Sequence, residues 1–227
     1  MCSPVTARCV NTGLLELDIR DIKDYAPGSF RRIDDSPYGG GPGMIMRCQP
    51  VLDALKAARK PEGRIRVAAL TPSGRCFTQP DARRYASYDQ VILICGHYEG
   101  MDERIYRYVD EKVSLGDFIL TGGEPAALLI LDSVARLLPG ALRRESTQTE
   151  SFENGRLEYP QYTRPAEYQG DPVPEVLLSG DHEKIRRWRC ARSLELTARL
   201  RPDLFERYPM SLEEREIWEA DLERSEK

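Results

Sequence analysis

Short apolar runs recur along the chain at residues 66–70, 91–95 and 117–120. The run at 91–95 is unbroken and rich in β-branched residues, which predicts a strand covered on both faces. Apolar residues at helical spacing predict helices at residues 49–59 and 125–138. The repeated order of strand, loop and helix therefore predicts an α/β fold with a parallel sheet flanked by helices.

Each predicted strand is followed by a loop that contains glycine, at residues 71–74, 96–100 and 121–123. Glycine lets a backbone approach a ligand closely because no Cβ intervenes, and open α/β sheets bind ligands at the carboxyl ends of their strands. Ordinary strand-to-helix turns are the alternative interpretation. The loop at 96–100 lacks the spacings of dinucleotide and Walker motifs, so it does not indicate a dinucleotide or triphosphate site.

The first third of the chain is less regular. Residues 5–11 predict a helix that ends at Gly13, and residues 14–19 predict a strand. Residues 22–46 are loop-rich around a glycine-rich centre at 39–43. Three glycines framed by two prolines predict a loop that exposes its backbone. A flexible connector is the alternative.

The last third of the chain predicts a second domain. Residues 141–158 are polar and aperiodic, which is typical of an interdomain linker. From Pro174 onward the chain is expected to be helical, with Ser179 as a helix N-cap. We therefore expect a first domain at 1–140, a linker at 141–158, and a small, mainly helical C-terminal domain at 159–227.

Of the 227 residues, 31% are charged, and the formal net charge is −4, which gives no overall cationic signature of a nucleic-acid-binding protein. The charge is unevenly distributed. Residues 181–201 contain seven basic and three acidic side chains, a net of +4, whereas residues 202–227 contain nine acidic and four basic ones, a net of −5. We interpret the first stretch as a phosphate-binding surface and the second as a solvated tail. The alternative is solvated helix surface in both.

The six cysteines are scattered, with no Cys-x-x-Cys pair and no clustering with the two histidines. This pattern predicts reduced thiols rather than a disulfide framework, and no metal site. No apolar run approaches the roughly 18 residues of a membrane span, and the first residues do not resemble a signal peptide. We expect a soluble cytoplasmic protein that does not enter a membrane.

Five motifs occur in a fixed order along the chain: Pro-Tyr-Gly-Gly-Gly-Pro-Gly-Met at 37–44, Leu-Thr-Pro-Ser-Gly at 70–74, and the segments 96–104, 114–124 and 162–165. Together they resemble the bacterial tRNA (guanine-N1)-methyltransferase family over essentially the whole chain. This family belongs to the SPOUT class, so the resemblance implies a trefoil knot at the end of the α/β domain. Knots are rare among folds, and spacing alone does not predict one.

The resemblance implies methyl transfer from S-adenosylmethionine to N1 of the guanosine immediately 3′ of the tRNA anticodon. It also implies a homodimer whose active site is shared between subunits, and a Mg²⁺ dependence. The glycine-rich loop at 39–43 is expected near the bound nucleotide. The positions that match the family's cofactor site are Leu70, Pro72, Gly96, Tyr98, Glu99, Gly100, Leu115, Gly116, Asp117, Phe118, Ile119, Leu120, Gly122 and Gly123.

Two further residues match the family's catalytic positions. Arg136 matches the arginine at the guanine O6, where negative charge develops as N1 loses its proton. Its alternative role is a surface ion pair with Asp132 at i, i+4 spacing. Glu150 precedes Ser151-Phe152, where the family carries an Asp that is the general base. Without the resemblance, Glu150 would be interpreted as a solvated linker charge.

The chain departs from the family in two ways. Members normally begin with a buried strand and a Phe-Pro turn, which have no counterpart before residue 5. Either the sequence begins inside the protein, or the sheet is one strand short and has an open edge. The linker is also one residue shorter than usual, while Glu150 is one methylene longer than Asp. A weak or inactive relative that binds tRNA or cofactor, and a knotted RNA methyltransferase for another base, are therefore the alternatives.

Overall fold

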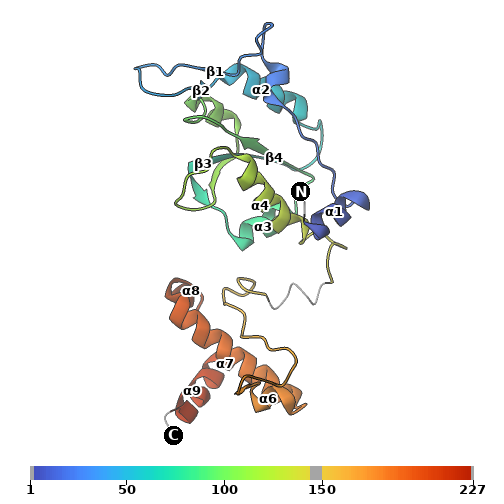
Figure 1. The fold of residues 1–227 in the computed structure, drawn as a ribbon, viewed down its shortest axis with the longest axis vertical. Helices are drawn as coiled ribbons and strands as arrows, with labels where there is room; N and C mark the ends of the chain where they lie inside the picture. The colour runs from blue at the N-terminus through green and yellow to red at the C-terminus, as the bar shows by residue number, and fades with distance from the viewer. Residues whose placement is uncertain (1–2, 144–149, 226–227) are drawn as a thin grey trace. The chain divides into compact units, whose positions relative to one another are not determined.

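The computed structural model describes residues 3–143 and 150–225, and the chain divides into two compact units (Figure 1). The N-terminal unit comprises residues 1–143 and the C-terminal unit residues 144–227. Each unit buries its own apolar side chains. A unit with its own core is the usual physical definition of a domain.

A parallel sheet of three strands forms the N-terminal unit, in the order β4-β3-β5. The central strand β3 spans Ile65–Cys76, and it lies between β4 (Gln90–Cys95) and β5 (Glu111–Ser114). The strands predicted at 66–70 and 91–95 are therefore confirmed, as is their parallel arrangement.

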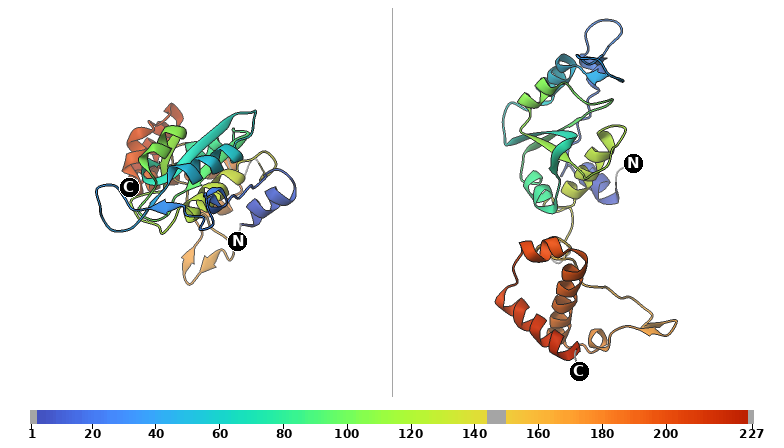
Figure 2. Two further views of the ribbon diagram at one scale, coloured as in Figure 1. Left: turned by 90° about the horizontal axis from the view of Figure 1, so that it is seen from above. Right: turned by 90° about the vertical axis from the view of Figure 1, so that its left-hand side faces the viewer.

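One face of the sheet is covered by α2 (Cys48–Ala58) and by the 3-10 helix η2 (Glu103–Tyr108) (Figure 1; Figure 2). The β3 side chains Val67 and Ala69 point to this face and pack against Ile105 of η2 in one hydrophobic core. The helix predicted at 49–59 is confirmed by α2.

The opposite face is covered by α3 (Gln79–Tyr85) and α4 (Glu124–Ala135). Ala68 and Leu70 point to this face, because successive side chains of a strand alternate between its two sides. Ile130 of α4 is buried in the same core. The result is a sheet between two helical layers, with α4 confirming the helix predicted from residue 125.

Beyond Leu70, β3 leaves its regular register. Leu70 and Arg75 both pair with Val113 of β5, so residues 71–74 form an excursion between two points opposite the same residue. Such an irregularity bends the strand and redirects its side chains. The Thr-Pro-Ser-Gly sequence predicted as a strand end is therefore an insertion within a longer strand.

Other predictions at the sheet are wrong. Residues 14–19 and 117–120 are all described, and neither stretch forms a strand. β5 begins instead at Glu111, before the apolar run. β4 is an edge strand of the described sheet, but both of its faces are covered, as predicted: Ile92 and Ile94 pack on one core, and Val91, Leu93 and Cys95 pack on the other.

The segment before α2 has little regular structure. The helix predicted at 5–11 is confirmed as α1 (Pro4–Asn11), and η1 (Ile22–Tyr25) is a single 3-10 turn. β1 (Asp34–Asp35) and β2 (Ile45–Met46) form a short antiparallel pair. This pair brackets the glycine-rich loop and fixes both of its ends.

Helices dominate the C-terminal unit, as expected. A small hairpin of β6 (Glu167–Tyr168) and β7 (Asp171–Pro172) precedes α6 (Glu175–Leu178). The longest helix of the described unit, α7 (His182–Leu200), then packs against the two helices that complete the unit. These are α8 (Pro202–Arg207) and α9 (Leu212–Ser225).

Two expectations for this unit are wrong. The N-cap of α7 is Asp181, whose carboxylate accepts a hydrogen bond from the amide of Lys184 at 3.1 Å. Ser179 instead follows α6 and accepts a hydrogen bond from the amide of Asp181. The acidic tail is not merely solvated either, because Glu213 of α9 forms an ion pair with Arg186 of α7 at 2.6 Å.

Candidate cofactor cleft and catalytic residues

A cleft of about 580 Å³ opens in the N-terminal unit where the three parallel strands end. Three segments provide most of its lining: residues 70–73 at the excursion of β3, residues 96–101 after β4, and a set of residues between 113 and 123 after the start of β5. Glu103, Tyr106 and Ala126 complete it. The carboxyl ends of parallel strands are the expected place for a ligand site in an open α/β sheet.

Thirteen of the fourteen predicted cofactor positions line this cleft. Asp117 is the exception; it lies in a turn in which the amide of Phe118 donates to the carbonyl of Gly116 at 3.0 Å. The structure thus brings together residues as far apart in the sequence as Leu70 and Gly123. Their role in cofactor binding stays a prediction. The thirteen positions are Leu70, Pro72, Gly96, Tyr98, Glu99, Gly100, Leu115, Gly116, Phe118, Ile119, Leu120, Gly122 and Gly123.

Sequence reasoning missed a polar contact between two of these segments. His97 Nε2 lies 2.6 Å from Glu124 Oε1, and His97 also pairs with Gly122 as an isolated β-bridge. The amide of Gly123 donates to the carbonyl of Gly96 at 2.9 Å beside them. The sequence offered one clue to this contact: His97 lies in the glycine-bearing loop at 96–100, and Glu124 directly follows the one at 121–123. Their separation of 27 residues concealed the pairing.

The glycine-rich loop is fastened to the same cleft. Glu99 Oε2 accepts a hydrogen bond from the amide of Met44 at 2.8 Å, and the amide of Glu99 donates to the carbonyl of Met44 at 3.2 Å. The amide of Met46 donates to the carbonyl of Gly100 at 2.9 Å. The loop at 39–43 therefore ends directly against the cleft segment 96–101.

Cys95 lies at the end of β4, next to the cleft. Burial, together with the nearby carboxylate of Glu124, raises the pKa of the Cys95 thiol to about 11. A thiol with this pKa stays protonated at neutral pH and is a poor nucleophile. Cys95 therefore packs as a small apolar group, and the five cysteines of the described residues form no disulfide.

The two predicted catalytic residues belong to different units. Arg136 follows the last residue of α4 and is not among the residues that line the cleft. Asp132, its suggested ion-pair partner, accepts hydrogen bonds from the hydroxyls of Ser3 and Thr6. Glu150 begins a turn of the C-terminal unit, in which the amide of Glu153 donates to its carbonyl at 3.2 Å. Their roles stay predictions.

The basic stretch of the C-terminal unit, residues 181–201, consists of α7 and its two cap residues. Ion pairs involve four of its seven cations, among them Arg186 with Glu183 and Arg192 with Glu195 and Asp221. Two others, Arg187 and Arg199, form no ion pair within residues 150–225. Part of the stretch therefore forms ion pairs within the unit, and part forms none among residues 150–225.

Neither a metal centre nor a membrane span is evident in the part of the chain that the structure describes. No group of three His, Cys, Asp or Glu side chains there could hold a metal ion. None of the helices in that part is both long and apolar enough to cross a membrane.

The helix-covered parallel sheet and its cleft define an α/β protein with a cleft at the carboxyl ends of its strands, where such sheets bind ligands. Comparison with known proteins specifies the class further. The family model described as tRNA (Guanine-1)-methyltransferase TrmD matches residues 1–207. The chain belongs to this tRNA (guanine-1)-methyltransferase family.

Individual relatives agree with the family match. A tRNA (guanine-N(1)-)-methyltransferase of Clostridium botulinum strain Langeland is 49% identical over 214 residues, which are 94% of this chain and 89% of the relative. One from Clostridium kluyveri strain ATCC 8527 is also 49% identical over 214 residues, covering 94% and 87% of the two chains. The similarity thus spans both units.

Proposed function

We propose that the protein methylates tRNA, transferring the methyl group of S-adenosylmethionine to N1 of the guanosine immediately 3′ of the anticodon. Family membership supports the reaction and the tRNA substrate. One observation of the structure carries the proposal further. A single cleft at the ends of three strands gathers thirteen positions that the family resemblance assigns to the cofactor.

The residues of the cleft suit this cofactor. Backbone groups of the segments 96–100 and 121–123 can read the edge of an adenine ring, while Leu70, Leu115 and Leu120 offer apolar surface for its faces. When bound, S-adenosylmethionine supplies an electrophilic methyl group on a good leaving group. The protein therefore needs to hold the cofactor and to activate the guanine.

Activation of the guanine is the task of Glu150 and Arg136. The N1–H of guanine is a weak acid, and N1 becomes a competent nucleophile only as its proton is withdrawn. We assign this proton to the carboxylate of Glu150, which acts as a general base. Negative charge then develops on O6, where the fixed positive charge of Arg136 stabilises it.

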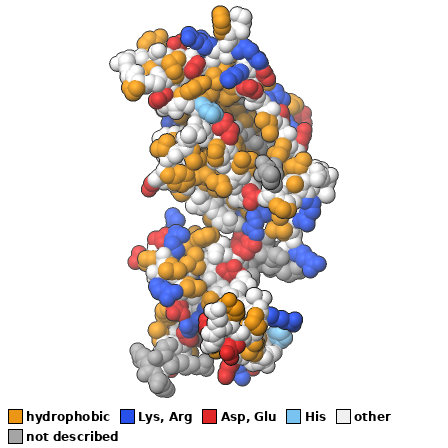
Figure 3. Space-filling view, in the orientation of Figure 1, with side chains coloured by type: hydrophobic (Ala, Val, Ile, Leu, Met, Phe, Trp, Pro, Cys, Tyr) orange, Lys and Arg blue, Asp and Glu red, His pale blue; other side chains and the backbone are white. Residues whose placement is uncertain are grey.

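Exposed apolar surface supports a homodimer with a shared active site. Phe118, Ile119, Leu128 and Leu129 are all more than 45% exposed, and hydrophobic side chains cover much of the visible face of the N-terminal unit (Figure 3). Clustered apolar surface of this kind is typical of a protein interface. In such a dimer, each active site combines Glu150 of one chain with the cleft and Arg136 of the other chain.

The excursion of β3 supports the trefoil knot of the SPOUT class. Residues 71–74 leave the sheet opposite Val113 and return opposite the same residue, which lies 38 positions further along the chain. The amide of Phe77 then donates to the carbonyl of Ser114 at 2.8 Å. These contacts hold residues 70–77 directly against residues 113–114, and a knot at this position would need such close contact between the two segments.

Arginines of α7 support tRNA binding by the C-terminal unit. Arg187 and Arg199 keep charge that neutralises phosphate, and Arg189 lies over the ring of Tyr159 at 4.8 Å. A cytoplasmic location follows from the tRNA substrate. The Mg²⁺ dependence has no three-ligand site among residues 3–143 and 150–225, so we derive no step through a metal.

A methyl-transfer assay tests the proposed function. Full-length tRNA transcript is incubated with labelled S-adenosylmethionine, and the product is mapped by mass spectrometry. We expect one methyl group, on the guanosine beside the anticodon, and none on a transcript that carries adenosine there. Binding of tRNA and cofactor without transfer would identify an inactive relative. Transfer to another nucleotide would identify a knotted methyltransferase with a different target.

A further inference from the structure

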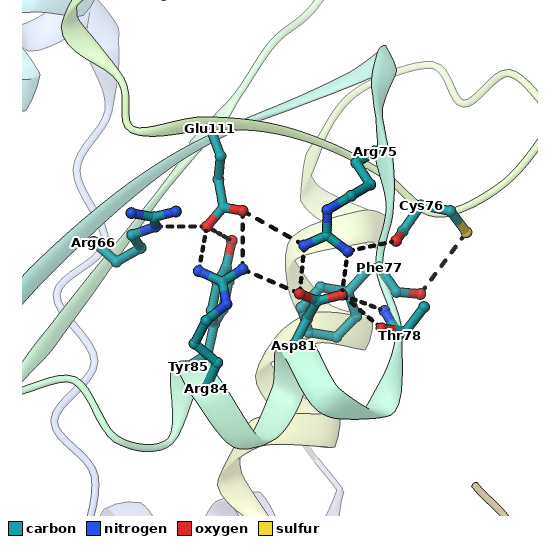
Figure 4. A network of polar contacts seen from close by, with 9 residues as sticks. All are labelled: Arg66, Arg75, Cys76, Phe77, Thr78, Asp81, Arg84, Tyr85 and Glu111. Atoms are coloured by element: carbon teal, nitrogen blue, oxygen red, sulfur yellow. Dashed lines mark hydrogen bonds and ion pairs between the residues drawn. The ribbon is translucent and has the colours of Figure 1, made fainter. Parts of the chain in front are cut away.

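Outside the lining of the cleft, a network of charged side chains joins four segments of the N-terminal unit (Figure 4). Its anions are Asp81 of α3 and Glu111 of β5. Its cations are Arg66 of β3, Arg84 of α3, and Arg75, where β3 returns to the sheet after the excursion. None of the five residues lines the cleft.

The two carboxylates form the centre of the network. Side-chain exposure is only 7% for Asp81 and 14% for Glu111. Asp81 accepts hydrogen bonds from Arg75 Nη1 at 2.8 Å and from Arg84 Nη2 at 3.1 Å. It also accepts from both the amide and the hydroxyl of Thr78. Buried ionised carboxylates with this many donors are held in one geometry.

Arg75 connects this rigid centre to the wall of the cleft. Residues 71–73 line the cleft and are followed directly by Gly74 and Arg75. The guanidinium of Arg75 forms a two-pronged contact with Asp81 and lies 3.8 Å from Glu111. Glu111 in turn lies two residues before Val113, another residue of the wall.

Close backbone packing transmits the position of Arg75. A Cβ added to Gly74 would overlap the backbone of Lys112 and Val113, so the excursion rests directly on β5. Displacing residue 75 therefore displaces residues 71–73 relative to Val113, because there is no side chain between the two backbones that could absorb the movement.

We propose that Arg75, through its contact with Asp81, is a positioning residue that sets the cleft wall at residues 71–73 and thereby the affinity for S-adenosylmethionine. The inference rests on the proposed function, because it assigns the cofactor to this cleft. It concerns binding rather than chemistry, since none of the five network residues lines the cleft.

Arg66 provides a matched control within the same network. It donates from Nε to Glu111 at 2.7 Å, but it lies near the start of β3, four residues before the first residue of the cleft. Removal of either arginine deletes one cation from the network. Only Arg75 is continuous with the cleft wall, so only its removal should change the affinity for the cofactor.

Calorimetry with S-adenosylhomocysteine, the demethylated cofactor, tests the inference on the full chain. We expect Arg75→Ala to weaken binding about fivefold, the scale of one ordinary hydrogen bond, and Arg66→Ala to leave it unchanged. In the methylation assay, Arg75→Ala should raise the KM for S-adenosylmethionine while kcat at saturation is retained. Arg75→Lys should restore part of the affinity, because it keeps the charge but loses the second prong.

Each result decides a different point. Normal affinity in a folded Arg75→Ala protein would overturn the positioning role and leave the proposed function standing. An equal loss in Arg66→Ala would also overturn it, because a general loss of stability would then explain both variants. A wild-type protein that does not bind S-adenosylhomocysteine would overturn the cofactor assignment itself, and the inference with it.

Discussion

The carboxylate of Glu99 occupies the space that a side chain on Gly43 would fill. In this position it accepts the hydrogen bond from the amide of Met44 and holds the glycine-rich loop against the cleft. Gly43 has φ of +79°, a conformation that other residues adopt only with strain. Gly43 is therefore required both by its backbone and by its neighbour.

Gly43→Ala should displace Glu99 and release the loop from the cleft. Gly40→Ala is the matched control, because Gly40 has the same φ of +79° but no atom within 4 Å of an added Cβ. Both variants carry the backbone strain, of roughly 1–2 kcal/mol. Only Gly43→Ala should also lower kcat/KM for tRNA methylation. Equal activity of the two variants would show that the contact with Glu99 has no role.

The contact between His97 and Glu124 should contribute modestly to cofactor binding, because it joins two walls of the cleft. Both side chains are about half exposed, at 45% and 56%, so we expect a coupling of less than about 1 kcal/mol. A double-mutant cycle of His97→Ala and Glu124→Ala, measured by calorimetry with S-adenosylhomocysteine, gives this value. Strictly additive losses would mean that the two residues act independently.

Glu150→Gln should remove the general base and leave binding intact. Gln has the size of Glu but cannot accept the N1 proton, so the single-turnover rate should fall about 10²–10⁴-fold. Affinity for tRNA and cofactor should not change. Glu150→Asp tests whether the shorter linker requires the longer side chain of Glu. If it does, the Asp variant should be slower than wild type. An unchanged rate in Glu150→Gln would transfer the role to another carboxylate, first Glu153.

Mixed dimers test the shared active site. Glu150→Ala and Arg136→Ala chains are each expected to be inactive alone. After subunit exchange, half of the dimers are mixed and one of their two sites is intact, so about a quarter of wild-type activity should return. Subunit exchange is verified by native mass spectrometry. A mixture that exchanges and stays inactive would place both residues in the same chain's site.

Acid should destabilise the N-terminal unit through Glu111. Burial by itself would raise the pKa of Glu111, but hydrogen bonds from Arg84, Arg66 and Tyr85 outweigh it and lower this pKa from 4.5 to about 2. A lowered folded-state pKa contributes stability above pH 4.5 that is lost as the pH falls toward 2. Wild type should therefore be more stable than Glu111→Gln at neutral pH, with the difference in Tm closing across this window.

Glu16→Gln is the control for this titration. Glu16 forms an ion pair with Lys60 at 3.1 Å but is 78% exposed, and exposed pairs contribute little to stability. Its Tm should follow that of wild type at every pH. A Tm difference for Glu111→Gln that does not depend on pH would mean that the charge of Glu111 does not stabilise the fold.

The sequence predicted the parts of the fold that local pattern determines. Residues 91–95 form a strand because an uninterrupted apolar run of that length suits few other structures. β5 was missed because it starts with two charged residues, Glu111 and Lys112, whose partners are distant arginines and aromatic rings. The run at 117–120 is apolar but forms a turn beside Gly116. Strand pairing is long-range, so neither outcome was available from local sequence.

The position of the cleft was predictable to a similar degree. Glycines after strands indicated where it would open, and the positions taken from the family resemblance line it with the exception of Asp117. The contact of His97 with Glu124 and the network around Asp81 were not predictable, because both depend on which segments the fold places side by side. Local sequence carries no information about contacts of this kind.

The cleft takes its walls from three segments that are distant along the chain, residues 70–73, 96–101 and the part between 113 and 123. A ligand that contacts all three segments can bind only to protein in which the whole N-terminal unit is folded. Its binding then adds to the free energy of unfolding in proportion to the logarithm of its concentration. Amide hydrogens of the three segments should therefore become protected from exchange together, as one cooperative unit, when the cleft is filled.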